Sequence, residues 1–299
     1  MIEAIGLTKS FDDIKAIDHI TATIRDNEVF GLIGTNGAGK STFLKLVSGI
    51  LKPDGGELLI NGKSVFEEES LKETFFYISD DPYYFSNATP DVMMSFYQIM
   101  YPGFDVTYYR KLMTAFSLDA ARKIATFSKG MKKQLFIILG LASNAKYLLC
   151  DETFDGLDPV MRQAVKSLFA EGISERGLTP VIASHNLREL EDICDHVGLL
   201  HKGGILFSRD LDDMKLNLHK IQCVLAPGKT LNDLTGLKIV LSEQRGSIYT
   251  LTVQGTENEV MDQMRQYETI FFEMVPLTLE EIFISETEVN GYDIKKLVL

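Results

Sequence analysis

Alternating and continuous runs of apolar residues in the first part of the chain predict many strands. Residues 2–7 and 14–24 alternate apolar and polar positions, the two-residue period of a strand with one buried face. Continuous apolar runs are typical of strands that are buried on both faces of a parallel sheet. Such runs occupy residues 29–33, 74–78, 147–150 and 180–183. Helical spacing of apolar residues between these runs completes the pattern of an α/β protein.

The pattern changes after residue 217, which we take as the end of a first domain covering residues 1–217. Three later stretches alternate like strands, namely residues 220–225, 237–241 and 248–253. Thr256 and Glu259 have the spacing of a capping box at the start of a helix. Apolar residues at helical spacing follow at Val260, Met264 and Tyr267. We therefore expect a small C-terminal α+β accessory domain over residues 218–299, whose role in regulation, dimerisation or covering the first domain is left open.

The composition excludes several classes of partner. The 30 basic and 42 acidic residues give a net charge of −12, which argues against nucleic acid or anionic lipid as the main partner. The three cysteines have no paired or metal-like spacing, which favours a reducing cytoplasm. We expect no signal peptide before the first strand, and the longest apolar run, residues 135–142, is too short to span a bilayer. If the protein acts at a membrane, another chain must supply the spanning part.

Residues 83–116 carry a high density of aromatic rings. The stretch holds 10 of the 29 aromatic residues of the chain, and its pattern is helical and irregular. Rings at this density either fill a core or line a groove for a partner, and the sequence favours neither. The stretch opens a helical subdomain that we expect to extend over about residues 83–145.

A phosphate-binding loop follows the apolar run at 29–33 and precedes a helical pattern. Its residues are Gly34, Thr35, Asn36, Gly37, Ala38, Gly39, Lys40, Ser41 and Thr42. Glycines allow successive backbone N–H groups to face phosphate oxygens, and a helix N-terminus adds partial positive charge. Lys40 can reach the β- and γ-phosphates of a nucleotide, and the Ser41 hydroxyl can bind Mg²⁺. A glycine-rich surface turn is the alternative, but the flanking strand and helix disfavour it.

Polar residues follow two of the continuous apolar runs. Asp151 and Glu152 come directly after the run at 147–150, and His185 closely follows the run at 180–183. Open α/β sheets bind ligands at the carboxyl ends of their strands. Asp151 therefore fits a carboxylate that holds Mg²⁺, usually through a water, and Glu152 fits a base for an attacking water. A lone histidine at a strand end is more often structural, but this one is expected at the same sheet edge.

Three further segments offer polar or aromatic side chains. Residues 126–134 form a polar loop before an apolar helix at 135–141, and Ser128 in this loop fits either a second anion site or an ordinary helix cap. Asp158 fits the cap of the next helix, because a proline follows it. Phe11 lies in a polar turn between the first two strands, and from its position alone it fits either a core residue or a presented ring.

In this order and spacing, the segments resemble the nucleotide-binding subunit of an ABC transporter. The resemblance covers roughly the first 215 residues and implies a P-loop ATPase core with an antiparallel β subdomain and a helical subdomain. It implies that Phe11 stacks on adenine, that residues 34–42 are the Walker A loop and that residues 147–152 are Walker B. It also implies a signature that contacts the ATP of the partner subunit, made of Ser128, Lys129, Gly130 and Met131. Asp158 would lie in the D-loop, and His185 would be the switch histidine.

The chain departs from the family pattern in two places. The signature of the family reads LSGGQ, whereas here Lys129 replaces its first glycine and Met131 its glutamine. This version resembles a branch that exports antibiotics, peptides and similar amphiphiles. The glutamine of the family's Q-loop aligns with Asp80, a residue type that binds Mg²⁺ well but is shorter and negatively charged. The expected metal ligands are therefore Ser41 and Asp151, with Asp80 as a hypothesis.

The resemblance implies a head-to-tail pair of ATP-binding subunits, identical or different, that hold two ATP molecules between them. Mg²⁺ accompanies each ATP, Glu152 orients or deprotonates water, and His185 hydrogen-bonds the γ-phosphate. ATP binding closes the pair and hydrolysis opens it. The expected subunit is cytoplasmic and peripheral on the inner face of the cell membrane, bound to separate transmembrane permease subunits. Its expected function is to power export of an amphiphilic peptide, antibiotic or lipid-like substrate.

A second class of function stays open, that of a soluble ABC ATPase acting in macromolecular assembly, repair or translation. The single nucleotide-binding unit, the acidic charge and the lack of a long coiled-coil insertion argue against this class. The aromatic stretch at 83–116 also favours a transporter, since transporters receive coupling helices in this region. No nucleic-acid partner is expected.

Overall fold

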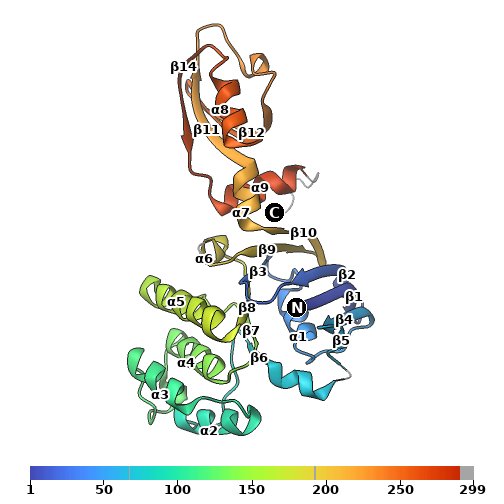
Figure 1. The fold of residues 1–299 in the computed structure, drawn as a ribbon, viewed down its shortest axis with the longest axis vertical. Coiled ribbons are helices and arrows are strands. Elements are labelled where there is room, and N and C mark those ends of the chain that lie inside the picture. The colour runs from blue at the N-terminus through green and yellow to red at the C-terminus, as the bar shows by residue number, and fades with distance from the viewer. Residues whose placement is uncertain (67, 192, 290–299) are drawn as a thin grey trace. The chain divides into compact units, whose positions relative to one another are not determined.

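The computed structural model describes residues 1–66, 68–191 and 193–289. The chain divides into two compact units, Met1–Ser208 and Arg209–Leu299 (Figure 1). This division falls earlier than the boundary after residue 217 expected from the sequence pattern. The difference is the helix α7 (Leu211–Asn217), which contacts the strand β11 (Leu218–Leu225) and so belongs to the second unit.

A four-stranded antiparallel sheet begins the first unit. Its strands lie in the order β2 (Ile14–Ile24), β1 (Ile2–Phe11), β4 (Gly55–Ile60) and β5 (Lys63–Ser64). Alternate residues in the second half of β2 are buried, as its two-residue period predicts. Asn61 and Gly62 connect β4 to β5 with φ angles of 50° and 79°, the left-handed values that a two-residue hairpin turn requires.

A six-stranded sheet forms the centre of the first unit. Its order is β10 (Gly204–Asp210), β9 (His196–His201), β3 (Phe30–Ile33), β8 (Thr179–Ser184), β7 (Tyr147–Asp151) and β6 (Phe75–Ile78). The neighbours from β9 to β6 pair in parallel. All residues of β3, β7 and β8 are buried, as expected for strands covered on both faces. Because these three strands are parallel neighbours, their carboxyl ends meet at one edge of the sheet.

Helices alternate with these strands along the chain. They are α1 (Lys40–Val47), η1 (Glu69–Thr74), α2 (Pro90–Met100), α3 (Val106–Ala115), η2 (Ile124–Thr126), α4 (Lys129–Ala142), α5 (Pro159–Arg176) and α6 (Leu187–Leu190). The helices α2, α3 and α4 occupy the stretch that the sequence assigns to a helical subdomain, and they gather at one end of the first unit in Figure 1.

Helix α4 begins at Lys129, which corrects the polar loop predicted over residues 126–134. Ser128 caps the helix, and its Oγ accepts a hydrogen bond from the backbone N–H of Met131 at 3.2 Å. The first turns carry lysines rather than an apolar period, so the sequence pattern concealed the first two turns of the helix. The signature residues therefore stand on a capped helix start.

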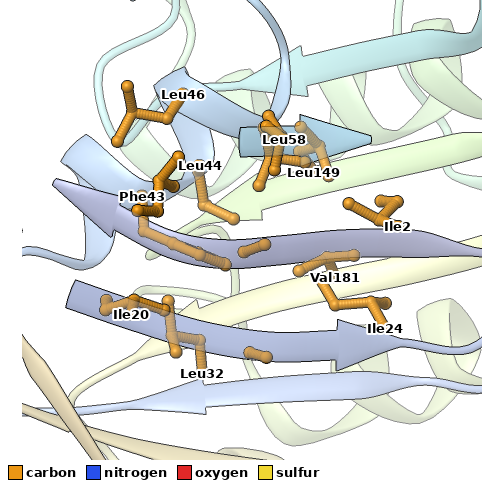
Figure 2. Close-up of a cluster of buried hydrophobic side chains, with 14 of the residues drawn as sticks. Ile2, Ile20, Ile24, Leu32, Phe43, Leu44, Leu46, Leu58, Leu149 and Val181 are labelled. Atoms are coloured by element: carbon orange, nitrogen blue, oxygen red, sulfur yellow. The ribbon is translucent and has the colours of Figure 1, made fainter. Parts of the chain in front are cut away.

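The main core lies between the antiparallel sheet, the helix α1 and the parallel sheet. Figure 2 shows Ile2 and Ile24 of the antiparallel sheet near Val181 of β8, and Phe43 and Leu44 on α1 farther along the same cluster. These side chains are at most 1% exposed. Burial of each large apolar side chain stabilises the fold by about 1.5–3 kcal/mol. This packing fixes α1, and with it the loop that precedes α1, against the sheet.

The second unit is a small α+β structure. Its sheet has the order β12 (Lys238–Arg245), β13 (Ile248–Gln254), β11 and β14 (Thr269–Val275), with all pairs antiparallel. Besides α7, its described helical elements are η3 (Leu231–Asp233), α8 (Glu257–Met264) and α9 (Leu279–Val289). Thr256 and Glu259 form the capping box that their spacing predicts. Val260 and Met264 of α8 are buried against the sheet, whereas Tyr267 lies beyond the end of the helix.

Candidate active site

The loop between β3 and α1 is shaped by glycines. Gly37 and Gly39 have φ angles of 82° and 108°, in the left-handed region that other residues rarely adopt. A Cβ on Gly39 would collide with the carbonyl oxygen of Ala16, while the space around Gly37 is open. The chain therefore wraps tightly behind the loop and leaves room in front of it. This open face is where the backbone amides of the predicted phosphate site would meet a ligand.

Lys40 folds back across this loop. Its side chain is only 5% exposed, and its Nζ donates hydrogen bonds to the carbonyl oxygens of Gly34 at 2.7 Å and Thr35 at 3.2 Å. The same Nζ lies 3.1 Å from Oε1 of Glu152. The structure thus places the ammonium group at the loop, where the sequence predicts that it binds phosphate.

Asp151 ends the buried strand β7 and offers a carboxylate oxygen. Its Oδ2 accepts a hydrogen bond from the Tyr77 hydroxyl at 2.9 Å, while its buried Oδ1 has no hydrogen-bond partner among the described residues. Burial raises the pKa of Asp151, and hydrogen bonds from Ser41 and Tyr77 offset this rise in part. Sequence reasoning missed Tyr77, which occurs in an apolar run and carries no motif.

This arrangement fits a Mg²⁺ ion that is completed by phosphate oxygens. A buried carboxylate oxygen without a partner, close to the hydroxyl of Ser41, supplies hard oxygen ligands of the kind that Mg²⁺ prefers. Within residues 1–66, 68–191 and 193–289, no group of three or more His, Cys, Asp or Glu side chains could hold a metal by itself. A cation here would therefore depend on the bound nucleotide for its remaining ligands.

Glu152 lies between a lysine and a histidine. Its Oε1 faces Lys40, and its Oε2 lies 2.8 Å from Nδ1 of His185, which follows strand β8. The φ angle of Glu152 is 49°, and its backbone N–H donates to the Ala183 carbonyl oxygen at 2.9 Å. A left-handed non-glycine residue is held at an energetic cost, and such residues cluster at active sites. The structure therefore brings together Lys40 at the start of α1, Glu152 after β7 and His185 after β8.

The signature residues lie beside the segment that follows Glu152. The Nζ of Lys129 is 2.8 Å from Oδ2 of Asp155, and this hydrogen bond lowers the pKa of Asp155. A Cβ on Gly130 would come within 2.9 Å of the Gly156 carbonyl oxygen, so the two backbones pack closely. Among the hydrogen bonds and ion pairs of the part of the chain that the structure describes, none joins this signature to the phosphate loop.

The structure settles the local settings of Asp158 and Phe11 that the sequence left open, a helix cap and an exposed ring, while their roles toward ATP stay predictions. Asp158 caps α5, with its Oδ1 accepting from the Met161 N–H at 2.9 Å, as the following proline predicts. Phe11 ends β1 and is 44% exposed, so it is a presented ring and not a core residue. The Nζ of Lys9 lies 5.6 Å from the centre of this ring.

Asp80 pairs with lysines of helix α4. Its Oδ1 lies 3.0 Å from Nζ of Lys133 and 3.8 Å from Nζ of Lys129. The buried Lys133 also donates to the backbone carbonyl of Glu152. Sequence reasoning missed Lys133, although its helical spacing to Phe136 and Ile137 is a signal that it faces inward.

The aromatic stretch both fills the core and forms a groove. Phe104, Tyr109 and Phe116 are buried, whereas Tyr83 is 76% exposed. A pocket of about 230 Å³ lies over this region. It is lined by Tyr77, Ser79, Pro82, Tyr83, Phe85, Met93, Phe96, Tyr97 and Phe136. Some rings of the stretch therefore fill the core and others line a pocket, and a partner in that pocket stays a prediction.

A loop of backbone amides with a buried lysine, close to paired carboxylates at the end of β7, the next strand but one in the sheet, defines a P-loop ATPase. Comparison with known proteins identifies the family within the P-loop ATPases to which the chain belongs. The family model for ABC transporters matches residues 17–155. The ABC transporter ATP-binding protein YtrB of Bacillus subtilis is 30% identical over 286 residues, which cover 96% of this chain and 98% of YtrB.

Two further relatives agree with this assignment. The bacitracin transport ATP-binding protein BcrA of Bacillus licheniformis is 28% identical and aligns over 72% of this chain and 71% of its own length. A solved structure of an ATP-binding subunit of an ABC transporter superposes with a TM-score of 0.66 at 28% identity, covering 72% of this chain and 92% of that one. The chain therefore belongs to the ABC transporter ATP-binding proteins.

The family, the P-loop ABC ATPase fold and the ATP hydrolase activity predicted from the sequence are confirmed. The protein is the ATP-binding subunit of an ABC transporter. The match to YtrB extends over nearly the whole chain, so it includes most of the second unit as well as the ATPase core. Throughout the described residues, no helix is both long enough and apolar enough to cross a bilayer.

Proposed function

We propose that this subunit powers export of an amphiphilic peptide, antibiotic or lipid-like substrate, through ATP-driven closure of a head-to-tail pair of subunits. The observation that carries the hydrolytic part is the convergence of Lys40, Glu152 and His185, joined by contacts of 3.1 Å and 2.8 Å. Such a group can bind the γ-phosphate and hold the attacking water in one place.

The chain's own residues divide the chemistry among them. Lys40 and the amides of its loop bind the phosphates, Glu152 orients or deprotonates water, and His185 hydrogen-bonds the γ-phosphate. Ser41 and Asp151 would hold the Mg²⁺ ion, which when bound neutralises charge on the phosphates. Asp80 stays a prediction as a further ligand, because its Oδ1 already faces two ammonium groups.

The second half of each ATP site would come from a partner subunit. Ser128, Lys129, Gly130 and Met131 lie at the start of α4, where a capped helix end offers backbone N–H groups to an anion. The lack of a described contact between this signature and the phosphate loop of the same chain supports a role toward the ATP of the partner. Asp158 would stand in the same interface, and the exposed ring of Phe11 would stack on adenine.

A membrane partner would bind the pocket over residues 83–116 that is lined by Tyr83, Phe85 and Phe96, called the aromatic groove below. Exposed rings at Tyr83, Phe85 and Phe96 form an apolar surface of the kind that receives a partner helix. Separate permease subunits docked there would place this subunit at the inner face of the cell membrane. The name of BcrA, a bacitracin transport protein, supports an amphiphilic peptide as the class of substrate. Co-purification of the full chain with a multi-spanning protein tests this part.

Mixed subunits test the shared ATP site. Lys40→Met removes the phosphate-binding ammonium, whereas Ser128→Asp keeps a good helix cap but sets a negative charge against a partner's phosphate. Each variant alone should lack ATPase activity. A mixed pair retains one intact composite site, so differently tagged subunits purified together should recover about half of the wild-type rate. No recovery in the mixed pair would contradict the head-to-tail arrangement of identical chains.

A further inference from the structure

Lys133 buries an ammonium group beside the active site. Its side chain is 1% exposed, although lysine is almost never fully buried without partners. Its Nζ pairs with Oδ1 of Asp80 at 3.0 Å and donates a hydrogen bond to the backbone carbonyl of Glu152. Since an unpaired buried charge is costly, Lys133 holds both partners in place.

The carbonyl that Lys133 contacts belongs to a strained residue. Glu152 has a φ angle of 49°, which persists only where the surroundings hold it. Its N–H is held by Ala183 on one side, and its carbonyl oxygen is held by Lys133 on the other. With both backbone groups fixed, the side chain is directed between Lys40 and His185. Loss of Lys133 would release one of the two backbone anchors.

Asp80 connects this anchor to the surface. The carboxylate is on a side chain that is 54% exposed, and the residue follows strand β6 by two positions. Ser79, Pro82 and Tyr83 of the same segment line the aromatic groove. A single buried lysine therefore links a solvent-facing group beside the groove to the backbone of Glu152.

We infer that Lys133 is a positioning residue for ATP hydrolysis and that Asp80 acts on Glu152 through it. The inference rests on the proposed function, because it takes Glu152 as the group that orients water. Lys133 holds the left-handed turn at Glu152, and Asp80 holds the ammonium of Lys133. A partner that binds the groove and moves Asp80 would thereby change the orientation of Glu152. This role differs from ligation of Mg²⁺ by Asp80, and the two roles give different results.

The first experiment replaces the ammonium in the full-length chain. Lys133→Met has a similar length and no charge, and Lys132→Met is a matched control on the same helix, since Lys132 contacts the Tyr84 hydroxyl at 3.1 Å instead. We expect Lys133→Met to lower kcat about tenfold to a hundredfold, with the Kd for a fluorescent ATP analogue nearly unchanged. The control should keep the wild-type kcat. A wild-type kcat in Lys133→Met overturns the inference.

A double-mutant cycle tests whether Asp80 acts through the lysine. Asp80→Asn should lower kcat, and adding it to Lys133→Met should cause little further loss. The Mg²⁺ concentration for half-maximal ATPase activity should stay the same in Asp80→Asn. Independent, multiplicative losses overturn the inference, and so does a raised Mg²⁺ requirement, which is the result expected if Asp80 binds the metal.

A neutral pair guards against a folding defect. If Lys133→Met does not fold, the double variant Asp80→Asn with Lys133→Gln is used instead. It removes both charges of the pair, so neither position keeps a charge without its partner. This variant should bind the ATP analogue normally and show a lowered kcat, whereas a wild-type kcat overturns the inference. Glu152→Gln is the reference. If Glu152→Gln is inactive and Lys133→Met fully active, only this inference fails, and if Glu152→Gln is active, the proposed function fails with it.

Discussion

Lys40 and Glu152 form a salt bridge of 3.1 Å between side chains that are 5% and 15% exposed. The group predicted to bind phosphate is thus held by the group predicted to activate water. Bound phosphates would compete with the carboxylate for the same ammonium, because both are anions. ATP binding would then release Glu152 from Lys40 and leave it hydrogen-bonded to His185. Through this salt bridge, binding of phosphate at the loop would determine whether the Glu152 carboxylate is free to accept a proton from water.

The first prediction concerns Glu152→Gln. We expect multiple turnover to fall by about 10²–10⁴-fold, because glutamine cannot accept the proton of the attacking water. ATP should bind at least as tightly as in the wild type, since the competing negative charge on Lys40 is gone, and ATP should still drive closure of the pair. Steady-state phosphate release and equilibrium ATP binding measure the two effects. Normal steady-state ATPase activity would remove Glu152 from its role.

The second prediction concerns the stability of the subunit without nucleotide. Burial raises the pKa of Asp151, so this residue contributes stability that is lost as the pH rises through its folded-state pKa. Asp151→Asn removes this cost at neutral pH and should raise the free energy of unfolding by about 1 kcal/mol, as active-site replacements often do. The same change should abolish Mg²⁺-dependent ATP hydrolysis.

Calorimetry in the absence of nucleotide measures this trade between stability and activity. Asp54→Asn is the matched control, because a hydrogen bond from Lys9 lowers the pKa of Asp54 and the replacement should not stabilise the protein. A lower melting temperature in Asp151→Asn than in the wild type would show that the hydrogen bonds of the Asp151 carboxylate already offset the cost of burying its charge.

Features with local causes could be predicted from the sequence. Asp158 caps α5 because the cap and the proline after it are adjacent, and the contiguous loop at residues 34–42 follows its strand as expected. The hairpin at Asn61 and Gly62 depends only on the φ angles of two residues. The family and fold followed because several such local segments occur in a fixed order.

The contacts that organise the site have distant causes. Tyr77 and Asp151 are 74 residues apart, and Lys133 and Asp80 are 53 residues apart. Which of these side chains meet depends on the order of the strands and on which strand α4 packs against, neither of which a local pattern contains. The exposure of Phe11 could not be predicted from its local sequence for the same reason, since it depends on which surfaces the rest of the chain leaves uncovered.

The third prediction tests the exposed ring at the end of β1. Phe11→Ala should weaken ATP binding about fivefold, or about 1 kcal/mol, because stacking on adenine is lost while the phosphate loop is intact. Phe11→Tyr should keep the affinity. Ile14→Ala is the control, since Ile14 is 71% exposed and pairs with Phe11 in the same hairpin. Equal losses for Phe11→Ala and Ile14→Ala would point to the hairpin rather than the ring.

The fourth prediction concerns acid stability at Asp26. Burial disfavours the charged carboxylate, but hydrogen bonds, among them those from Lys146 at 2.6 Å and Tyr147 at 2.8 Å, outweigh this and lower the pKa of Asp26 to about 2. The stability that Asp26 contributes is therefore fully present above the ordinary pKa near 3.8 and is lost as the pH falls toward 2. Solvent screening limits this contribution to about 1 kcal/mol.

Asp26→Asn isolates this contribution from the other carboxylates of the chain. The variant should be less stable than the wild type by about 1 kcal/mol at pH 6. The difference should shrink at pH 3, because the carboxylate takes up a proton in the unfolded wild-type chain, where its pKa is near 3.8. Denaturant unfolding at the two pH values measures both. Asp13→Asn, at an exposed position in the β1–β2 turn, is the control and should show no difference at either pH. If the difference between Asp26→Asn and the wild type is the same at pH 6 and at pH 3, Asp26 stabilises the fold through the geometry of its hydrogen bonds alone. Only the part of the stabilisation that depends on the negative charge of Asp26 is lost in acid.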